Sequence, residues 1–288
     1  TLFRSPAPIA AAIRCYQNHA TRPAARAWVG CSGSGGQKRL LSPSTNHSGA
    51  LSQMNEPSPR TLSVDIGGTG IKMLVLDADG HPVTERTREL TPRPALPVTV
   101  LEVLGRMFQA HRPFHRVSVG FPGVVRQGVV KTAPNLDTTL WAGQAFEAEI
   151  AELADCPARV INDADLQGYG VVRGEGVEMV LTLGTGLGAA LFVNGHLVPN
   201  LELGHHPFEK GLTYEERVRE KELDRIGRQR WSKRVGRMLD QLAPIFNFDT
   251  LYLGGGNLKK LELTLPDNVV RFENVQGLRG GIRLWDDH

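Results

Sequence analysis

Among the residues of this chain that could do chemistry, one carboxylate stands at the end of an apolar run. Asp163 and its neighbour Asn162 follow Arg159–Ile161, a short run that predicts a strand delivering both side chains into a cleft. A carboxylate in such a place can accept the proton of a hydroxyl that attacks a phosphoryl group. Asn and Asp are also preferred helix caps, so the local sequence supports a catalytic base and a cap equally.

Glycine-rich turns suited to phosphate occur in both halves of the chain. Asp65-Ile-Gly-Gly-Thr-Gly70 joins two apolar runs, and Leu183-Gly-Thr-Gly-Leu-Gly188 does the same further on. Glycine allows positive φ and lets backbone amides approach an anion closely. One such turn is also simply a hairpin, whereas two facing one cleft indicate a site for a phosphate chain. Beside the first turn, Asp65 could hold Mg²⁺ through water and Lys72 could add a positive charge.

A third turn, Gly254-Gly-Gly-Asn257, follows the expected strand Leu251–Leu253. It suits either the sugar and base of a nucleotide or a tight strand-to-helix joint. No Walker A loop occurs, and a strand follows each of the first two turns where a dinucleotide fingerprint needs a helix. The candidate phosphate contacts are Asp65, Gly67, Gly68, Thr69, Gly70, Lys72, Gly184, Thr185, Gly186, Gly254, Gly255, Gly256 and Asn257.

Strands that alternate with helices must position these turns. In the first half we expect a hairpin, a helix and two strands, at Thr61–Ile66, Ile71–Leu76, 98–110, Arg116–Gly120 and Arg159–Ile161. In the second half we expect a hairpin, a helix and a strand, at Val177–Leu183, Ala189–Val193, about 231 to 243, and Leu251–Leu253. This α/β order predicts two lobes, over residues 61–162 and 163–288.

Composition is that of an ordinary globular protein. The chain has 288 residues, 41% of them apolar, and a formal net charge of +3, so overall charge neither demands nor excludes a polyanionic partner. Three widely spaced cysteines argue against a disulfide framework and favour a reducing, cytoplasmic setting. No apolar run approaches the roughly 20 residues that span a bilayer, so we expect no membrane association.

The N-terminal segment differs from the rest. Residues 1–55 contain no Asp or Glu and are rich in Ser, Ala, Gly and Pro, and the first methionine is Met54. An acid-poor, Arg- and Ser-rich beginning is typical of a transit peptide. We favour instead a tail over residues 1–60 that is disordered or foreign to the native protein.

In order and spacing, four motifs resemble the ROK (repressor, open reading frame, kinase) sugar kinases of the actin-like ATPase superfamily. They are Asp65-Ile-Gly-Gly-Thr-Gly, Leu183-Gly-Thr-Gly-Leu-Gly, Glu202-Leu-Gly-His205 and Gly254-Gly-Gly-Asn. Within that family the polyphosphate glucokinases are the most similar group, through Gly120-Phe-Pro-Gly-Val-Val125, Thr132-Ala-Pro-Asn-Leu136 with Trp141, Asn162-Asp-Ala-Asp165 and Val198-Pro-Asn-Leu-Glu-Leu-Gly-His205. The resemblance covers about residues 61–288.

The resemblance implies a two-lobed actin-like (ribonuclease H-like) fold, with mixed β-sheets flanked by helices that close on the substrate. It implies that Asp163 is the base for the 6-hydroxyl of glucose and that Mg²⁺ accompanies the donor. A homodimer is also implied. No zinc is expected, because the family's cysteine motif is missing after His205. The sugar contacts implied are Gly123, Asn135, Asn162, Glu202 and His205.

A basic segment could influence which phosphoryl donor the protein uses. Residues 225–237 contain six Arg or Lys and no acidic residue, and Arg230, Lys233, Arg234 and Arg237 share one face of the expected helix. That face could guide polyphosphate, or it could be a solvated basic surface. The donor could be polyphosphate, ATP or either.

Two other functions stay open. One is an ATP-dependent ROK kinase for glucose, fructose or an N-acetylated hexosamine. The other is a sugar-sensing ROK repressor, which needs a helix-turn-helix in front of the lobes. Residues 1–60 lack two adjacent amphipathic helices and carry six scattered prolines, so we expect no nucleic-acid partner.

Overall fold

A computed structural model describes residues 58–286 of the chain. The expected N-terminal extension lies outside the described residues except for 58–60, and so do Cys15 and Cys31. None of the helices between residues 58 and 286 combines the length and the hydropathy needed to cross a membrane.

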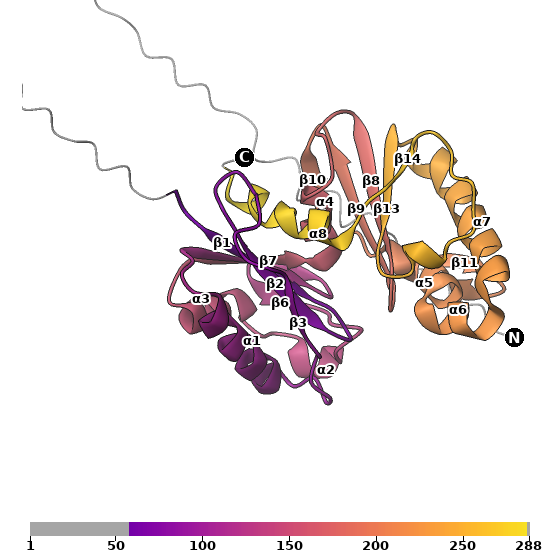
Figure 1. The fold of residues 1–288 in the computed structure, drawn as a ribbon. Helices are drawn as coiled ribbons and strands as arrows, with labels where there is room; N and C mark the ends of the chain where they lie inside the picture. Colours follow the sequence, from indigo (N-terminus) through magenta and orange to yellow (C-terminus); the bar gives the residue numbers. More distant parts are fainter. Residues whose placement is uncertain (1–57, 287–288) are drawn as a thin grey trace, which may run out of the picture. The chain divides into compact units, whose positions relative to one another are not determined.

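The first sheet has five strands in the order β3-β2-β1-β4-β7 (Figure 1). The strands β1 and β2 form the expected antiparallel hairpin, while β4 and β7 run parallel to β1. All six residues of β1 are buried, because the sheet is covered on both faces. The strands are β1 (Thr61–Ile66), β2 (Ile71–Leu76), β3 (Thr87–Glu89), β4 (Arg116–Phe121) and β7 (Ala158–Asn162).

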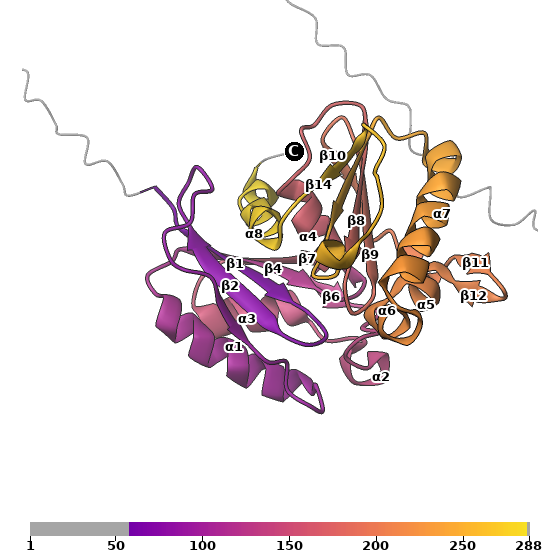
Figure 2. The same cartoon turned by 45° about the vertical axis from the view of Figure 1, so that its right-hand side comes forward.

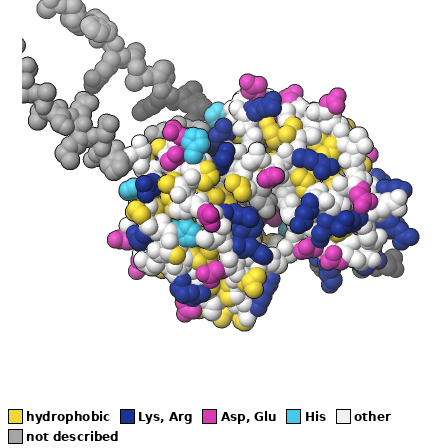
Figure 3. Space-filling model, viewed as in Figure 1, with side chains coloured by type: hydrophobic (Ala, Val, Ile, Leu, Met, Phe, Trp, Pro, Cys, Tyr) yellow, Lys and Arg dark blue, Asp and Glu magenta, His cyan; other side chains and the backbone are white. Residues whose placement is uncertain are grey.

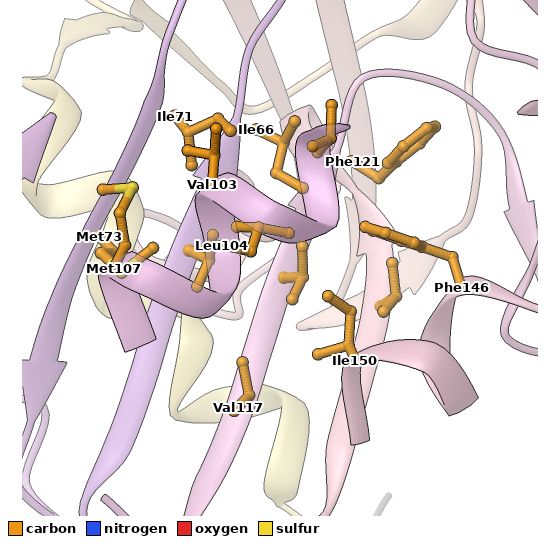
Figure 4. Close-up of a cluster of buried hydrophobic side chains, with 14 of the residues drawn as sticks. Ile66, Ile71, Met73, Val103, Leu104, Met107, Val117, Phe121, Phe146 and Ile150 are labelled. Atoms are coloured by element: carbon orange, nitrogen blue, oxygen red, sulfur yellow. The ribbon is translucent and has the colours of Figure 1, made fainter. Parts of the chain in front are cut away.

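Two helices cover one face of this sheet, α1 (Pro97–His111) and α3 (Phe146–Ala154). Side chains at helical spacing on α1, among them Leu104 and Met107, pack onto the strands together with Ile150 of α3 (Figure 4). The apolar spacing over 98–110 therefore predicted this helix correctly. The rest of the first half consists of a short ribbon and a short helix, β5 (Val125–Arg126), β6 (Val129–Val130) and α2 (Thr138–Trp141).

The second sheet has the order β10-β9-β8-β13-β14, which repeats the connectivity of the first. Three strands, β10, β9 and β8, form an antiparallel meander, and the two further strands, β13 and β14, run parallel to β8. The strands of this sheet are β8 (Val177–Leu183), β9 (Leu187–Val193), β10 (His196–Val198), β13 (Thr250–Gly254) and β14 (Val269–Arg271).

Helix α7 (Arg228–Phe246) covers the second sheet and extends beyond the expected 231–243 at both ends. Its apolar stripe, which includes Trp231 and Met238, packs against buried residues of β8 and β13. Beside it lie smaller elements, namely the ribbon β11 (Pro207–Glu209) and β12 (Leu212–Thr213), the helices α5 (Tyr214–Val218) and α6 (Glu220–Ile226), and the single 3₁₀ turns η2 (Leu203–His205) and η3 (Leu258–Lys260).

Two of the four cations on the basic face of α7 are neutralised, which neither a guide for polyphosphate nor a solvated basic surface predicted. Arg234 pairs with Glu222, and Nη2 of Arg237 lies 2.9 Å from Oε1 of Glu209. Nε of Arg225 lies 2.6 Å from Oε2 of Glu222, and Arg217 contacts both glutamates. Both glutamates lie outside the basic segment in the sequence, so the segment appeared unneutralised.

Helix α4 (Asp163–Tyr169) and the C-terminal segment lie between the two sheets (Figure 2). This segment comprises α8 (Asn274–Leu278), η4 (Arg279–Gly281) and η5 (Arg283–Trp285). It crosses to the first sheet, where the hydroxyls of Ser63 and Ser118 donate to the carbonyls of Leu278 and Gly281, each at 2.6 Å. The division into lobes at residues 162 and 163 stays a prediction.

The glutamate–arginine cluster leads to a stability prediction. Glu222→Gln removes the anion facing Arg217 and Arg234, whose side chains are only 8% and 11% exposed. We expect the free energy of unfolding to fall by about 2 kcal/mol, because two nearly buried guanidinium groups then share Glu209 as their counterion and lose the hydrogen bonds to Glu222. Denaturant titration at pH 7 measures this loss.

The same cluster has a pH signature. Hydrogen bonds from Arg225 lower the pKa of Glu222 from 4.5 to about 2. A carboxyl whose pKa is lower in the folded than in the unfolded protein stabilises the fold at pH values above its unfolded pKa. The native protein should therefore lose this contribution as pH falls from about 5 to 2, whereas Glu222→Gln has no such contribution to lose. The control is Arg230→Gln on the exposed face of α7, which should change stability little; a loss as large as that of Glu222→Gln would contradict the assignment.

Candidate active site

A cavity of about 380 Å³ lies between the two sheets. Lys and Arg side chains lie on both sides of this hollow (Figure 3). It is lined by every candidate residue except Gly254, namely Asp65, Gly67, Gly68, Thr69, Gly70, Lys72, Gly123, Asn135, Asn162, Asp163, Gly184, Thr185, Gly186, Glu202, His205, Gly255, Gly256 and Asn257. Gly254 lies inside β13, where an added Cβ would be 2.3 Å from the Phe272 ring.

Asn162 fixes the position of Asp163. Oδ1 of Asn162 accepts hydrogen bonds from the backbone N–H groups of Ala164 at 2.8 Å and Asp165 at 3.2 Å. Asn162 is therefore the N-cap of α4, and the alternative that Asp163 is the cap is wrong. Nδ2 of Asn162 donates to the carbonyl of Gly123 at 3.2 Å. Asp163 becomes the first helical residue, at the exact place where β7 reaches the cavity.

Carboxylates around Asp163 change its acidity. Burial raises the pKa of Asp163 well above its usual value, and the nearby negative charges of Asp65, Glu202 and Asp165 raise it further. Burial also raises the pKa of Glu202, which lies beside Asp163. An Asp with a raised pKa is a stronger base than an ordinary carboxylate, so it suits removal of a hydroxyl proton.

Asp165 ties the helix to the loop that carries Glu202. Its side chain is buried, Oδ2 accepts from the N–H of Asn200 at 3.0 Å, and Oδ1 has no hydrogen-bond partner. Burial raises the pKa of Asp165 to about 7. The side chain of Asn200 in turn bonds to both the N–H and the carbonyl of Val125, at 3.0 and 3.1 Å. Three segments that line or adjoin the cavity are thus joined.

The first glycine turn, 67–70, is held from behind. The Thr91 hydroxyl donates to the carbonyl of Gly67 at 2.6 Å, and Arg93 donates to the carbonyl of Gly68. These bonds use carbonyls, and the turn itself is closed by the N–H of Gly67, which donates to the carbonyl of Gly70 at 3.0 Å.

A row of charged residues crosses the sheet beside this turn. In the strand register, Asp65 of β1 lies opposite Lys72 of β2, and Lys72 lies opposite Arg88 of β3. Nζ of Lys72 lies 2.8 Å from Oδ2 of Asp65. The ammonium group that we expected to contact phosphate therefore forms an ion pair with Asp65. Oδ1 of Asp65 hydrogen-bonds to no residue within 58–286. One carboxylate oxygen, water and donor phosphates are the ligands that Mg²⁺ prefers, so Asp65 fits the expected role.

The second and third turns form one surface. Gly255 has φ of +93°, and an added Cβ would lie 2.4 Å from the carbonyl oxygen of Leu183. Only glycine permits both this conformation and this approach. Nδ2 of Asn257 donates to the carbonyl of Gly184 at 3.0 Å, so its side chain holds the second turn.

The candidate sugar residues line the same cavity as the glycine turns. Glu202 and His205 flank η2, with Oε2 and Nε2 3.4 Å apart. Asn135 packs between two glycine turns, because an added Cβ on Gly68 would lie 3.1 Å from its Cβ and one on Gly186 3.5 Å from its Nδ2.

Sequence reasoning missed several lining residues, namely Arg88, Gln167, Thr182, Glu215, Glu220, Lys259 and Lys260. Oε2 of Glu215 accepts from the N–H of Leu187 at 3.1 Å and braces the second turn. The only available signal was for Lys259 and Lys260, which follow the third turn directly. Arg88 and Glu215 reach the cavity through strand register and helix docking, and neither has a local signature.

Comparisons with known proteins agree with this geometry. The profile of the ROK family matches residues 61–223. Polyphosphate glucokinase of Mycobacterium leprae is 34% identical over 72% of this chain and 66% of its own length, so this chain spans slightly less than two thirds of that relative. Polyphosphate glucokinase of Mycobacterium tuberculosis is also 34% identical, over 71% of this chain and 80% of its own.

A solved structure is similar over nearly its whole length. The inorganic polyphosphate/ATP-glucomannokinase of Arthrobacter sp. strain KM superposes with a TM-score of 0.72 and 31% identity, covering 79% of this chain and 98% of its own. The expected actin-like fold, with mixed sheets flanked by helices, is confirmed. The matched residues 61–223 exceed half of the chain, and the chain therefore belongs to the ROK family.

Proposed function

We propose that this protein is a sugar kinase that transfers a phosphoryl group from polyphosphate, and also from ATP, to the 6-hydroxyl of glucose. The observation that carries the proposal is that Asp163, a partly buried carboxylate with a raised pKa, lines one cavity together with Glu202, His205 and the glycine turns. The names of the mycobacterial relatives and of the Arthrobacter structure support the sugar and the two donors.

In this mechanism Asn162, Glu202 and His205 hold the sugar and direct its 6-hydroxyl at the donor. Asp163 accepts the hydroxyl proton as the O6–P bond forms and the bond between that phosphorus and the bridging oxygen breaks. The products are glucose 6-phosphate and a donor shortened by one phosphoryl group. Backbone amides of the three turns face the phosphates, where they offset charge that builds up in the transition state.

Magnesium is part of this proposal. Asp65 would hold it, through water and together with donor phosphates, as is usual for Mg²⁺ in phosphoryl transfer. The ion would supply charge neutralisation for the donor. Nζ of Lys72 lies 2.8 Å from Oδ2 of Asp65, so Oδ1 is the oxygen that would face the ion.

The finer statements stay predictions. A cytoplasmic setting rests on the cysteine content of the sequence, and a homodimer rests on the resemblance. Light scattering coupled to size-exclusion chromatography measures the oligomeric state directly. A monomeric mass at micromolar concentration would contradict the dimer.

The first experiment is a glucose 6-phosphate-coupled assay with glucose and Mg²⁺, run with long-chain polyphosphate and with ATP. We expect turnover with both donors, with the greater kcat/KM for polyphosphate. Turnover with ATP alone would support the ATP-dependent kinase instead. No turnover with either donor would contradict glucose phosphorylation.

Asp163→Asn tests the base. This change keeps the size of the side chain and removes the proton acceptor, so we expect kcat to fall about 10²- to 10⁴-fold. Glucose affinity, measured by calorimetry, should change little. Asp240→Asn on the exposed face of α7 is the control and should keep normal turnover. Near-normal activity of Asp163→Asn would show that another group takes the proton.

The pH dependence of turnover tests the charge around Asp163. Because the base must be unprotonated and its pKa is raised, kcat at saturating glucose should rise with pH through a range above that of an ordinary carboxyl. Glu202→Gln removes a negative charge that raises this pKa, so the acidic limb of the kcat profile should move to lower pH. If the limb does not move, or moves to higher pH, the negative charge of Glu202 does not raise the pKa of the base.

A further inference from the structure

The cations that line the cavity differ in whether they are already paired. Lys72 is neutralised by Asp65, and Nζ of Lys260 lies 3.8 Å from Oε1 of Glu220. Arg88 and Lys259 are exposed and form no ion pair with any residue between 58 and 286. The cavity thus presents one unpaired cation from each half of the chain, Arg88 on β3 beside the first glycine turn and Lys259 in η3 after the third.

These cations lie beside different glycine turns of the cavity. The guanidinium of Arg88 lies against Gly70, because an added Cβ there would be 2.7 Å from its Nε. The first turn shares the cavity with Asp163, whose pKa is raised in part by Asp65 of the same turn. Arg88 therefore faces the cavity from the first turn, on β3, whereas Asp163 follows β7, and β3 and β7 are the two edge strands of the sheet. Lys259 and Lys260 form the 3₁₀ turn η3 directly after the third glycine turn, which packs on the second turn at Leu183 and Gly184.

On the basis of the proposed function, we infer that Lys259 and Lys260 form a polyphosphate-specific subsite that binds phosphates distal to the one transferred, whereas Arg88, beside the first glycine turn, contacts phosphates that every donor shares. Lysine suits this task because its ammonium is a point charge on a flexible stem, which can follow an irregular polyanion.

The chemistry of the cavity wall favours a polyanion over a nucleoside at this end. No Phe, Tyr or Trp is among the described residues that line the cavity. An adenine base would therefore find no such ring to stack on, whereas it would meet two ammonium groups. Polyphosphate carries about one negative charge on every unit, so each added lysine gains a partner.

Helix α7 is the rival location for the chain. Its arginines Arg234 and Arg237 are already paired with glutamates, as described above. Its remaining exposed cations, such as Arg230 and Lys233, do not line the cavity. The helix therefore offers surface charge without a path to Asp163.

The test compares donors in one set of variants. For Lys259→Gln/Lys260→Gln we expect the KM for long-chain polyphosphate to rise about tenfold, which corresponds to about 1.4 kcal/mol, and the KM for ATP by less than about threefold. The slope of log KM for polyphosphate against log salt should become shallower, because fewer counterions are released on binding. Arg88→Gln should impair both donors by similar factors.

The matched control removes the same charge from α7. Arg230→Gln/Lys233→Gln should leave the KM for polyphosphate and for ATP unchanged. The inference is overturned if the lysine variant affects both donors equally, or if the α7 variant alone raises the KM for polyphosphate. It is also overturned if the native protein makes glucose 6-phosphate from ATP but neither uses polyphosphate nor is inhibited by it. Failure to make glucose 6-phosphate from either donor would instead contradict the proposed function.

Discussion

The side-chain amide of Asn162 is the contact on which the cavity depends. Its Oδ1 accepts the backbone hydrogen bonds that begin α4 directly after β7, and its Nδ2 donates to the carbonyl of Gly123. Few side chains could do this, because the position needs an acceptor for helix amides and a donor for a carbonyl at once. The cap leaves Asp163 in the first turn of a helix, where amide dipoles favour its ionised form and partly oppose the effect of burial.

The hairpins, the parallel strands and the three glycine turns could be predicted from sequence because their signals are local. Apolar runs bounded by glycine give strand and turn together, as at Thr61–Ile66 followed by 67–70. Asn162, Asp163, Glu202 and His205 were found through motifs, and the structure gathers them in one cavity. These roles still await the experiments on turnover.

What sequence could not supply were partners brought together by the fold. Arg88 reaches the cavity only because β3 pairs with β2 in one particular register. Asp165 and Asn200 are 35 positions apart, yet they share a hydrogen bond that depends on how α4 docks. The basic segment at 225–237 illustrates the same limit, since Glu209 and Glu222 neutralise it from outside the segment. The net charge of a sequence segment therefore does not give the local charge around that segment in the folded protein.

The two sheets share one strand order, so α4 after β7 and α8 after β14 occupy equivalent places. These two short helices meet almost backbone to backbone: an added Cβ at Gly170 would lie 2.2 Å from the carbonyl oxygen of Gln276, and one at Gly280 would lie 2.0 Å from that of Leu166. Any side chain at either glycine would force these segments apart. The spacing between the two halves is thus set by residues that have no side chain at all.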